Sequence, residues 1–108
     1  ETGRAIVPPA CARCGAAVRP GVVWFGESLP ADAWLAARAA ASQCALFLSI
    51  GTSAMVYPAA DLPLRASRAG ATVVQVNPQA TPLDAHADFN LRGAAAQVLP
   101  RLLAAAGF

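Results

Sequence analysis

Two apolar runs separated by one helix-forming stretch constrain the fold of this chain most. Residues 44–50 form a nearly continuous apolar run, and residues 71–76 are rich in β-branched side chains. Both patterns predict strands, and the first predicts a strand buried on both faces. Residues 58–69 predict a helix closed by Gly70, with a late start or a kink at Pro63. Strands joined by single helices pair in parallel, so the sequence predicts an α/β fold with an open, Rossmann-like parallel sheet.

The flanking segments fit the same alternation. Residues 22–25 are a short apolar run that predicts another strand, and residues 31–43 contain almost only good helix formers. After residue 76 we expect a loop over 77–88, a short strand at 89–91 and a terminal helix at 94–106. Ligands of open α/β sheets bind beyond the carboxyl ends of the strands, so the turns after these strands are the candidate site.

Polar turns follow three of the predicted strands. Residues 25–27 are Phe-Gly-Glu, residues 51–53 are Gly-Thr-Ser, and Asn77 precedes a proline. Glycine allows a ligand to approach the backbone closely, and hydroxyl and amide groups can bond ribose or phosphate oxygens. Gly93, before the last helix, can admit an adenine edge. Each of these is also an ordinary structural turn when taken alone, and it is their shared sheet edge that favours a nucleotide site.

Cys11 and Cys14 form a Cys-x-x-Cys pair that Gly15 follows directly. Two thiolates two residues apart can bind one metal from a tight turn, and glycine adopts the positive φ that such a turn often needs. The pair predicts half of a tetrahedral zinc site whose other ligands precede Glu1. A redox dithiol and two unrelated thiols are the alternatives. Cys44 lies inside an apolar run and is interpreted as a small core residue.

Charge and hydropathy exclude several classes of partner. All eight basic residues are arginine, the net charge is only +2, and no basic run marks a surface for nucleic acid or membrane. No apolar stretch reaches ~18 residues, so no transmembrane helix is expected, and no signal peptide is visible. Three cysteines form no even disulfide framework. These features predict a cytoplasmic protein. The hydrophobic content of 56% is high for 108 residues and suggests a partner segment outside them.

The order of these motifs resembles the C-terminal half of a sirtuin, an NAD-dependent protein lysine deacylase of the Sir2 family. The match covers nearly the whole chain from about Cys11. It includes Cys-x-x-Cys-Gly, Arg19-Pro20-x-Val-Val-Trp-Phe-Gly-Glu, Gly-Thr-Ser-x-x-Val-Tyr-Pro from Gly51, Asn77-Pro78-x-x-Thr81-Pro82 and Leu91-Arg92-Gly93. Sirtuins cleave nicotinamide from NAD and move the acyl group of a protein lysine onto ADP-ribose. The resemblance therefore implies NAD and zinc as cofactors and an acyl-lysine protein or peptide as substrate.

The resemblance also implies roles for the residues that bind the substrate. Val23 would offer its backbone carbonyl to the acyl-lysine Nε, and Phe25 would pack against the acyl-lysine stem. The substrate backbone would lie as the middle strand of a three-strand staple. Its neighbours would be Gly26 and Glu27 on one side and Val56 and Tyr57 on the other.

The remaining site residues would bind the cofactors. Cys11 and Cys14 would be the second pair of zinc ligands. The NAD residues fall into three groups along the chain. Gly51, Thr52 and Ser53 would contact the ribose and phosphate region, Asn77 would hold the adenine-side ribose, and Gly93 and Ala94 would lie near the adenine.

Several parts of the family pattern are missing from the 108 residues. The Gly-Ala-Gly-x-Ser segment, the catalytic His-Gly and the first cysteine pair are absent and are expected before Glu1. The resemblance thus implies a fragment that is inactive alone, with no catalytic residue of its own, from a parent that is a monomer. The single histidine, His86, is interpreted as a solvated loop residue. Residues 1–19 would be part of a zinc module, and residues 20–108 the C-terminal part of the NAD-binding domain.

Two questions stay open at this point. The motif here is Trp-Phe-Gly-Glu, with Trp24 first, rather than Phe-Phe-Gly-Glu. It is similar to the sirtuin branch that includes desuccinylases, but the residues that read a succinyl carboxylate would also lie upstream. A non-catalytic nucleotide-binding domain and a Cys-x-x-Cys redox module are the alternative functions.

Overall fold

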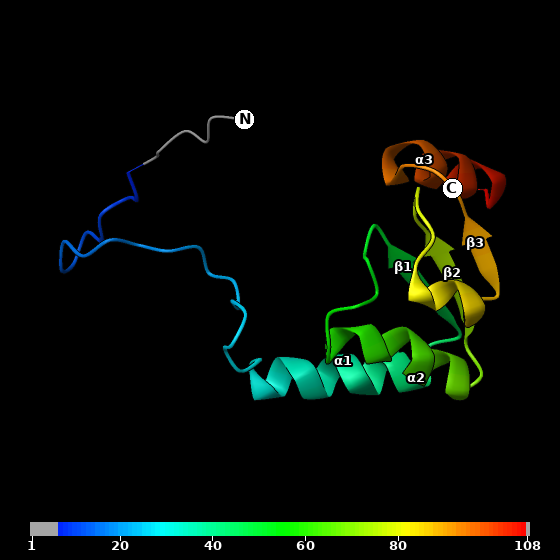
Figure 1. Ribbon diagram of the computed structural model, residues 1–108, viewed down its shortest axis with the longest axis horizontal. Helices are drawn as coiled ribbons and strands as arrows, with labels where there is room; N and C mark the ends of the chain where they lie inside the picture. Colours follow the sequence, from blue (N-terminus) through cyan, green and yellow to red (C-terminus); the bar gives the residue numbers. More distant parts are fainter. Residues whose placement is uncertain (1–6, 108) are drawn as a thin grey trace.

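Three parallel strands form the centre of the computed structural model, which describes residues 7–107 (Figure 1). The strands are β1 (Leu46–Ile50), β2 (Thr72–Val76) and β3 (Phe89–Leu91), and they lie in this order across the sheet. Val74 of β2 pairs with Leu48 on one side and with Phe89 on the other. The parallel order confirms the predicted open α/β sheet.

The helices agree with the sequence pattern, with one refinement at Pro63. They are α1 (Ala31–Gln43), α2 (Leu62–Arg68) and α3 (Ala95–Ala105), with two short 3-10 helices, η1 (Ala59–Asp61) and η2 (Pro82–Ala85). Pro63 lies in the first turn of α2, where its missing N–H has no helical partner to lose. The α-helix therefore starts late, as expected, and η1 occupies the residues before it. Within residues 7–107, no helix combines the length and the apolar character that a membrane crossing requires.

The hydrophobic core is small and consists largely of alanine. Ala41 of α1, Ala66 of α2, Val73 of β2, and Ala71 immediately before β2 form one buried cluster. Side chains this small allow α1 and α2 to pack closely against each other and allow α2 to lie near the sheet. Cys44 packs against the cluster, in agreement with its interpretation as a small core residue.

The expectation that the first strand is buried on both faces is wrong. Leu46, Leu48 and Ile50 of β1 are 54%, 43% and 38% exposed. β1 lies at the edge of the sheet, next to β2 only, and within residues 7–107 no strand pairs with its other side. Leu46, Leu48 and Ile50 alternate along the strand and share one face, which nothing in residues 7–107 covers over β1, whereas Ser49 on the opposite face is buried.

The strand predicted at 22–25 is also absent. Residues 7–30, which we call the N-terminal arm, contain no strand and extend away from the sheet, and α1 connects them to it (Figure 1). One isolated antiparallel bridge, between Ala10 and Ala17, is the only β pairing that the arm contains within the described residues. A short apolar run is extended here without a strand partner. The Phe-Gly-Glu turn at 25–27 therefore does not follow a strand, contrary to expectation. The proposed domain boundary between residues 19 and 20 stays a prediction.

A buried glutamine in β2 fixes the loop that follows the strand. Gln75 is fully buried, and its Nε2 donates to Asp84 Oδ1 at 2.6 Å and to Asn90 Oδ1 at 2.7 Å. Its Oε1 accepts a hydrogen bond from the Thr81 hydroxyl. One side chain therefore joins β2 to η2 and to β3.

Replacing Gln75 with leucine should destabilise the fold by about 2–4 kcal/mol, because leucine leaves the polar groups of Thr81, Asp84 and Asn90 without their buried partner. Urea denaturation followed by far-ultraviolet circular dichroism measures the change. Gln97→Leu, at an exposed position on α3, is the matched control and should stay within about 0.5 kcal/mol of wild type. Equal stability of Gln75→Leu and Gln97→Leu would show that the buried network contributes nothing.

Candidate functional site

The carboxyl ends of the three strands meet at one edge of the sheet. The Gly51 N–H donates to Val76 O at 2.9 Å, and the Asn77 N–H donates to Leu91 O at 3.1 Å. The Gly93 N–H donates to Asn77 O at 3.4 Å. The turns that follow β1, β2 and β3 are therefore in direct contact, and the residues predicted to contact the nucleotide lie together.

Asn77 joins two of these turns through its side chain. It is 8% exposed, its Nδ2 donates to Thr52 O at 2.8 Å, and its Oδ1 accepts from the Gln79 N–H at 3.0 Å. Both ends of the amide are thus used within the protein. The arrangement leaves Asn77 one further N–H of its amide for a ligand.

The turn after β1 exposes its hydroxyl groups. Gly51 has a φ of 64°, a left-handed conformation that glycine adopts without strain, and Gly51, Thr52 and Ser53 are all exposed. Thr52 Oγ1 accepts a hydrogen bond from the Ala54 N–H at 3.2 Å. Ala54 itself is left-handed, with a φ of 55°. The backbone of this turn therefore curves away from β1, and its exposed surface is polar.

The turn after β3 brings backbone and α3 close together. Gly93 has a φ of 151°, and a Cβ atom there would lie 2.8 Å from Val98 Cγ2. Only glycine fits this position, since a side chain would push α3 away from the strand ends. Ala94, exposed, is the residue immediately before α3. Gly93 and Ala94 therefore lie at the same sheet edge as Gly51 and Asn77.

A polar network holds the loop between β2 and β3. Thr81 and Asp84 form a capping box for η2: the Leu83 N–H donates to Thr81 Oγ1, and the Thr81 N–H donates to Asp84 Oδ1, both at 3.1 Å. Arg92, next to Gly93, forms an ion pair with Asp84. The Thr81 N–H is the largest cause that lowers the pKa of Asp84 below its usual 3.8, with further contributions from Gln75 and Arg92. Asp84 therefore stays ionised near neutral pH.

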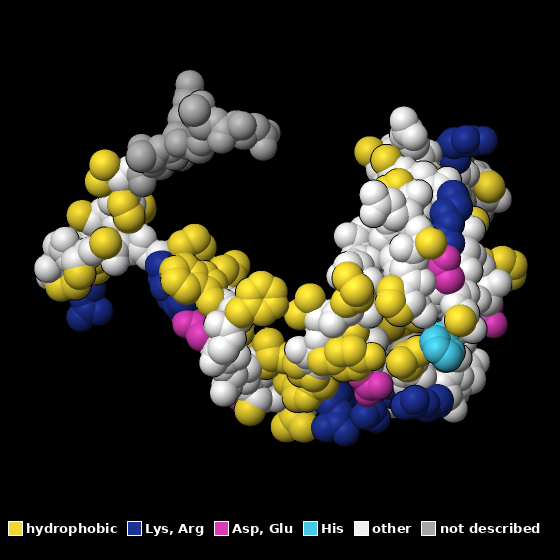
Figure 2. All heavy atoms as spheres, in the orientation of Figure 1, with side chains coloured by type: hydrophobic (Ala, Val, Ile, Leu, Met, Phe, Trp, Pro, Cys, Tyr) yellow, Lys and Arg dark blue, Asp and Glu magenta, His cyan; other side chains and the backbone are white. Residues whose placement is uncertain are grey.

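An apolar groove of about 390 Å³ lies between the N-terminal arm and the turn before η1. Figure 2 shows hydrophobic side chains along the inner side of the molecule, between the arm and the sheet. The walls of the groove come from two segments far apart in the sequence. They are residues 23–27 and 29 on one side and residues 56–58 on the other. All six residues predicted to bind the substrate line this groove: Val23, Phe25, Gly26, Glu27, Val56 and Tyr57.

The arm carries an ion pair at the groove, between the lining residue Glu27 and Arg19. Arg19 donates from Nη1 to Glu27 Oε1 at 2.7 Å and from Nη2 to Oε2 at 3.1 Å. The Trp24 N–H donates to Glu27 Oε2 at 3.0 Å. Hydrogen bonds from Arg19 first, and then from the Trp24 backbone, hold the pKa of Glu27 below its usual 4.5. The sequence motif includes Arg19, but the pattern assigns it no role.

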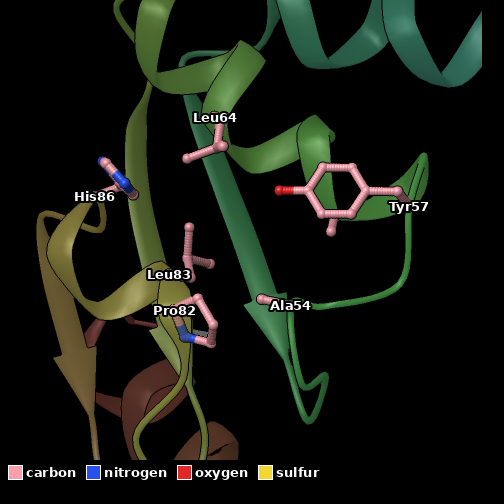
Figure 3. Close-up of a pocket in the computed structure, with 7 residues that line it drawn as sticks. Ala54, Tyr57, Leu64, Pro82, Leu83 and His86 are labelled. Atoms are coloured by element: carbon pink, nitrogen blue, oxygen red, sulfur yellow. The ribbon is translucent and has the colours of Figure 1, made fainter.

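A smaller pocket lies behind the groove and contains the only histidine of the chain (Figure 3). Its wall includes Tyr57 and Leu64 on one side and Leu83 and His86 on the other. The Tyr57 hydroxyl points into the pocket, toward Leu64, in Figure 3. His86 is exposed and follows η2 directly, as expected for a solvated loop residue. It is not among the residues that line the apolar groove.

The Cys-x-x-Cys segment of the arm forms a tight turn. The Gly15 N–H donates to Cys11 O at 2.8 Å, and Gly15 has the expected positive φ, 72°. Hydrogen bonds from the backbone of Arg13, and then of Cys14, lower the pKa of the Cys11 thiol below its usual 9.0. Such donors stabilise a thiolate, the form that binds a metal. Within residues 7–107, no group of three or more His, Cys, Asp or Glu side chains could hold a metal ion.

Comparison with known proteins gives a consistent result. Residues 2–58, more than half of the chain, match the model of the Sir2 family. The chain is 66% identical to an NAD-dependent protein deacylase of Methylococcus capsulatus over 105 residues, which are 97% of this chain and 41% of that protein. It is 53% identical to NAD-dependent protein deacylase 1 of Pseudomonas aeruginosa, over 95% of this chain and 41% of that protein. The chain thus spans about two fifths of the length of these relatives.

Solved structures agree with the sequence relatives. A structure described as "Sir2-p53 peptide-NAD+" superposes with a TM-score of 0.81 at 37% identity, covering 93% of this chain and 42% of that one. A second, described as a mutant Sir2 homologue in a complex with ADP ribose, has a TM-score of 0.80 at 44% identity, covering 89% and 39%. The three-strand sheet is therefore part of a larger fold in these structures.

Removing the charge of Asp84 should lower the free energy of unfolding relative to wild type, and this loss should be larger at neutral pH than in acid. Its pKa is lowered in the folded state, so it stabilises the fold above its unfolded pKa, and that contribution is lost as pH falls through the folded pKa. Asp84→Asn should therefore lose stability at pH 7, and its difference from wild type should shrink below about pH 4. Urea denaturation at pH 7 and at pH 3 tests this.

The matched control is Asp32→Asn, which removes the same charge from an exposed position in the first turn of α1. Its difference from wild type should change less between the two pH values. An Asp84→Asn difference that is the same at both pH values would contradict the role given to the carboxylate.

Proposed function

The chain belongs to the Sir2 family, and from that membership we propose that it is part of an NAD-dependent protein-lysine deacylase. The parent enzyme would move the acyl group of a protein lysine onto ADP-ribose and release nicotinamide. The observation that carries this proposal is the apolar groove, because it gathers every residue predicted to bind the acyl peptide from two distant segments. Relatives described as NAD-dependent protein deacylases, and a related structure described as "Sir2 bound to acetylated peptide", support it.

The groove suits an extended peptide with one long apolar side chain. Phe25 is 91% exposed and available to pack against the acyl-lysine stem. Within residues 7–107, no backbone hydrogen bond involves Gly26 or Tyr57 outside helices and strands. A peptide that adds as a middle strand would use such free backbone groups on both sides. Val23 would offer its carbonyl oxygen to the acyl-lysine Nε.

The edge of the sheet suits NAD. Gly51 has a left-handed backbone that glycine adopts without strain, and Gly93 is packed so closely against Val98 that a Cβ atom would collide with it. The hydroxyls of Thr52 and Ser53 belong to exposed residues. Asn77 lies between these turns. We propose that Gly51, Thr52 and Ser53 contact the ribose and phosphates, Asn77 the adenine-side ribose, and Gly93 with Ala94 the adenine. Bound NAD would supply the ADP-ribose that accepts the acyl group.

The 108 residues alone should not catalyse the reaction. Their only histidine, His86, lies in the smaller pocket rather than in the apolar groove. No other side chain at the groove is a suitable base for a ribose hydroxyl, since the Glu27 carboxylate is already paired with Arg19. Trp24 is compatible with the desuccinylase-like branch of the family.

We expect Phe25 to contribute to peptide affinity in the complete enzyme that contains this chain. Phe25→Ala should raise KM for an acyl-lysine peptide at least about tenfold and leave KM for NAD within about twofold, because burying a phenylalanine side chain contributes ~1.5–3 kcal/mol. Steady-state deacylation with a fixed excess of the other substrate measures both constants. Phe89→Ala, at an exposed phenylalanine on β3, is the control and should leave the peptide KM unchanged. Absence of NAD-dependent deacylation in the wild-type enzyme, or turnover by the 108 residues alone, would contradict the proposal.

We also propose that Cys11 and Cys14 supply two of the four ligands of a structural zinc ion. The complete protein should then contain about one zinc per chain, measured by elemental analysis after dialysis. Cys11→Ser and Cys14→Ser should each lose the zinc, whereas Cys44→Ser should retain it, because Cys44 lies against the core. A reversible Cys11–Cys14 disulfide in a zinc-free protein would instead support the redox alternative.

A further inference from the structure

The turn at residues 24–27 shapes one wall of the apolar groove and is held by its own side chains. The Glu27 N–H donates to Trp24 O at 3.0 Å, which closes a four-residue turn. Gly26, its third residue, has a φ of 85°, the value that a type II turn requires and that glycine adopts freely. Phe25, the second residue, projects from the turn and is 91% exposed. The direction of Phe25 therefore depends on the shape of this turn.

Both carboxylate oxygens of Glu27 accept hydrogen bonds from within the arm. One carboxylate oxygen accepts from Arg19 at 2.7 Å, and the other accepts both from Arg19 at 3.1 Å and from the Trp24 N–H at 3.0 Å. The backbone hydrogen bond and the carboxylate hydrogen bond therefore both join Glu27, the last residue of the turn, to Trp24, the first. This geometry gives Glu27 a role inside the turn, and leaves contact with a peptide to its backbone.

Arg19 connects to both ends of the same turn. Its guanidinium makes a two-bond ion pair with Glu27 and lies 4.7 Å from the centre of the Trp24 ring. A planar guanidinium can do both at once, whereas a lysine ammonium can make only a point contact. Arg19 does not itself line the groove, but it contacts two residues that do, Trp24 and Glu27.

We propose that Arg19 is a positioning residue for the acyl-peptide substrate: it holds the turn at 24–27 so that Phe25 and Gly26 face the groove. The inference rests on the proposed function of the groove. Most of the turn is exposed, including Trp24 at 52% and Phe25 at 91%, so packing alone does not fix it. Without Arg19, a glycine-containing turn of this kind samples other conformations, and the peptide must select the competent one.

The test uses the complete enzyme and measures KM for an acetyl-lysine peptide, KM for NAD and kcat. Arg19→Gln should raise the peptide KM about three- to tenfold, with KM for NAD and kcat within about twofold, because exposed but bidentate pairs make modest contributions. Arg19→Lys should recover part of the loss. Arg101→Gln, at an exposed arginine on α3, is the matched control and should match wild type.

A double-mutant cycle identifies the pair. Glu27→Gln should raise the peptide KM by a similar factor. The double variant, Arg19→Gln with Glu27→Gln, should have a peptide KM no higher than that of the more impaired single variant, because the two residues act as one unit. Independent, multiplying effects would overturn the inference, as would an unchanged peptide KM in Arg19→Gln or an equal rise in both KM values. If Arg19→Gln does not fold, Arg19→Lys and Glu27→Gln decide the same question.

Direct binding separates this inference from the proposed function. Fluorescence anisotropy of a labelled acetyl-lysine peptide gives its Kd without turnover. Weaker binding to Arg19→Gln than to Arg101→Gln supports the positioning role even in an enzyme without deacylase activity. Active wild-type enzyme with equal peptide Kd in both variants refutes the positioning role and leaves the proposed function intact.

Discussion

The hydrogen bonds of one buried glutamine determine how the strand ends are arranged. Gln75 lies in the middle strand, and its amide binds side chains from the loop on one side and from β3 on the other. A buried amide is expensive to leave unpaired, so the loop after β2 cannot move without a large loss of stability. Asn77 lies two residues later, and its side chain donates a hydrogen bond to Thr52 O, so it connects the end of β2 to the turn after β1. The candidate nucleotide edge is therefore organised before any ligand arrives.

The apolar groove has a wall that, unlike the turns at the sheet edge, is held by contacts of exposed side chains. One of its walls belongs to the N-terminal arm, which lies outside the sheet and exposes most of its side chains. Surface contacts of Arg19, Trp24 and Glu27 order that wall, rather than a packed core. Under the proposed function, this contrast would suit the two ligands: NAD would be the same molecule in every cycle and would suit a rigid site, whereas protein substrates would differ and would suit a less rigid wall.

The sequence predicted those parts of the fold that depend on local pattern. The helix at 31–43 and the strand at 71–76 follow from continuous helix-forming and β-branched runs, and both are present with nearly the expected bounds. The prediction of a strand at 22–25 was wrong, because a strand needs a neighbouring strand to pair with and no local pattern reveals whether one is present. The prediction that β1 is buried on both faces was wrong for a similar reason, because a local pattern does not show which segment covers each face of a strand. Topology correctly predicted that the turns after β1, β2 and β3 lie together, because parallel strands end at one edge, but it wrongly added the Phe-Gly-Glu turn, which follows no strand.

Other residues were missed because their role is visible only in three dimensions. Gln75 interrupts a β-branched run and looks like a solvent-facing position, yet it is fully buried. Arg19 lies eight residues before its partner Glu27, a spacing that has no regular meaning in an extended segment. Thr81 and Asp84 could have been found, because a threonine three residues before an acidic residue is the pattern of a capping box.

The alanine-rich core cluster is connected to the wall of the apolar groove. Ala66 is fully buried in α2, and η1 connects that helix directly to Tyr57 and Pro58 of the groove wall. A larger side chain at position 66 would displace α2 from the sheet and carry the wall with it. Under the proposed function, a substitution at such a core position would change the width of the groove, and with it the peptides that fit, without touching the substrate.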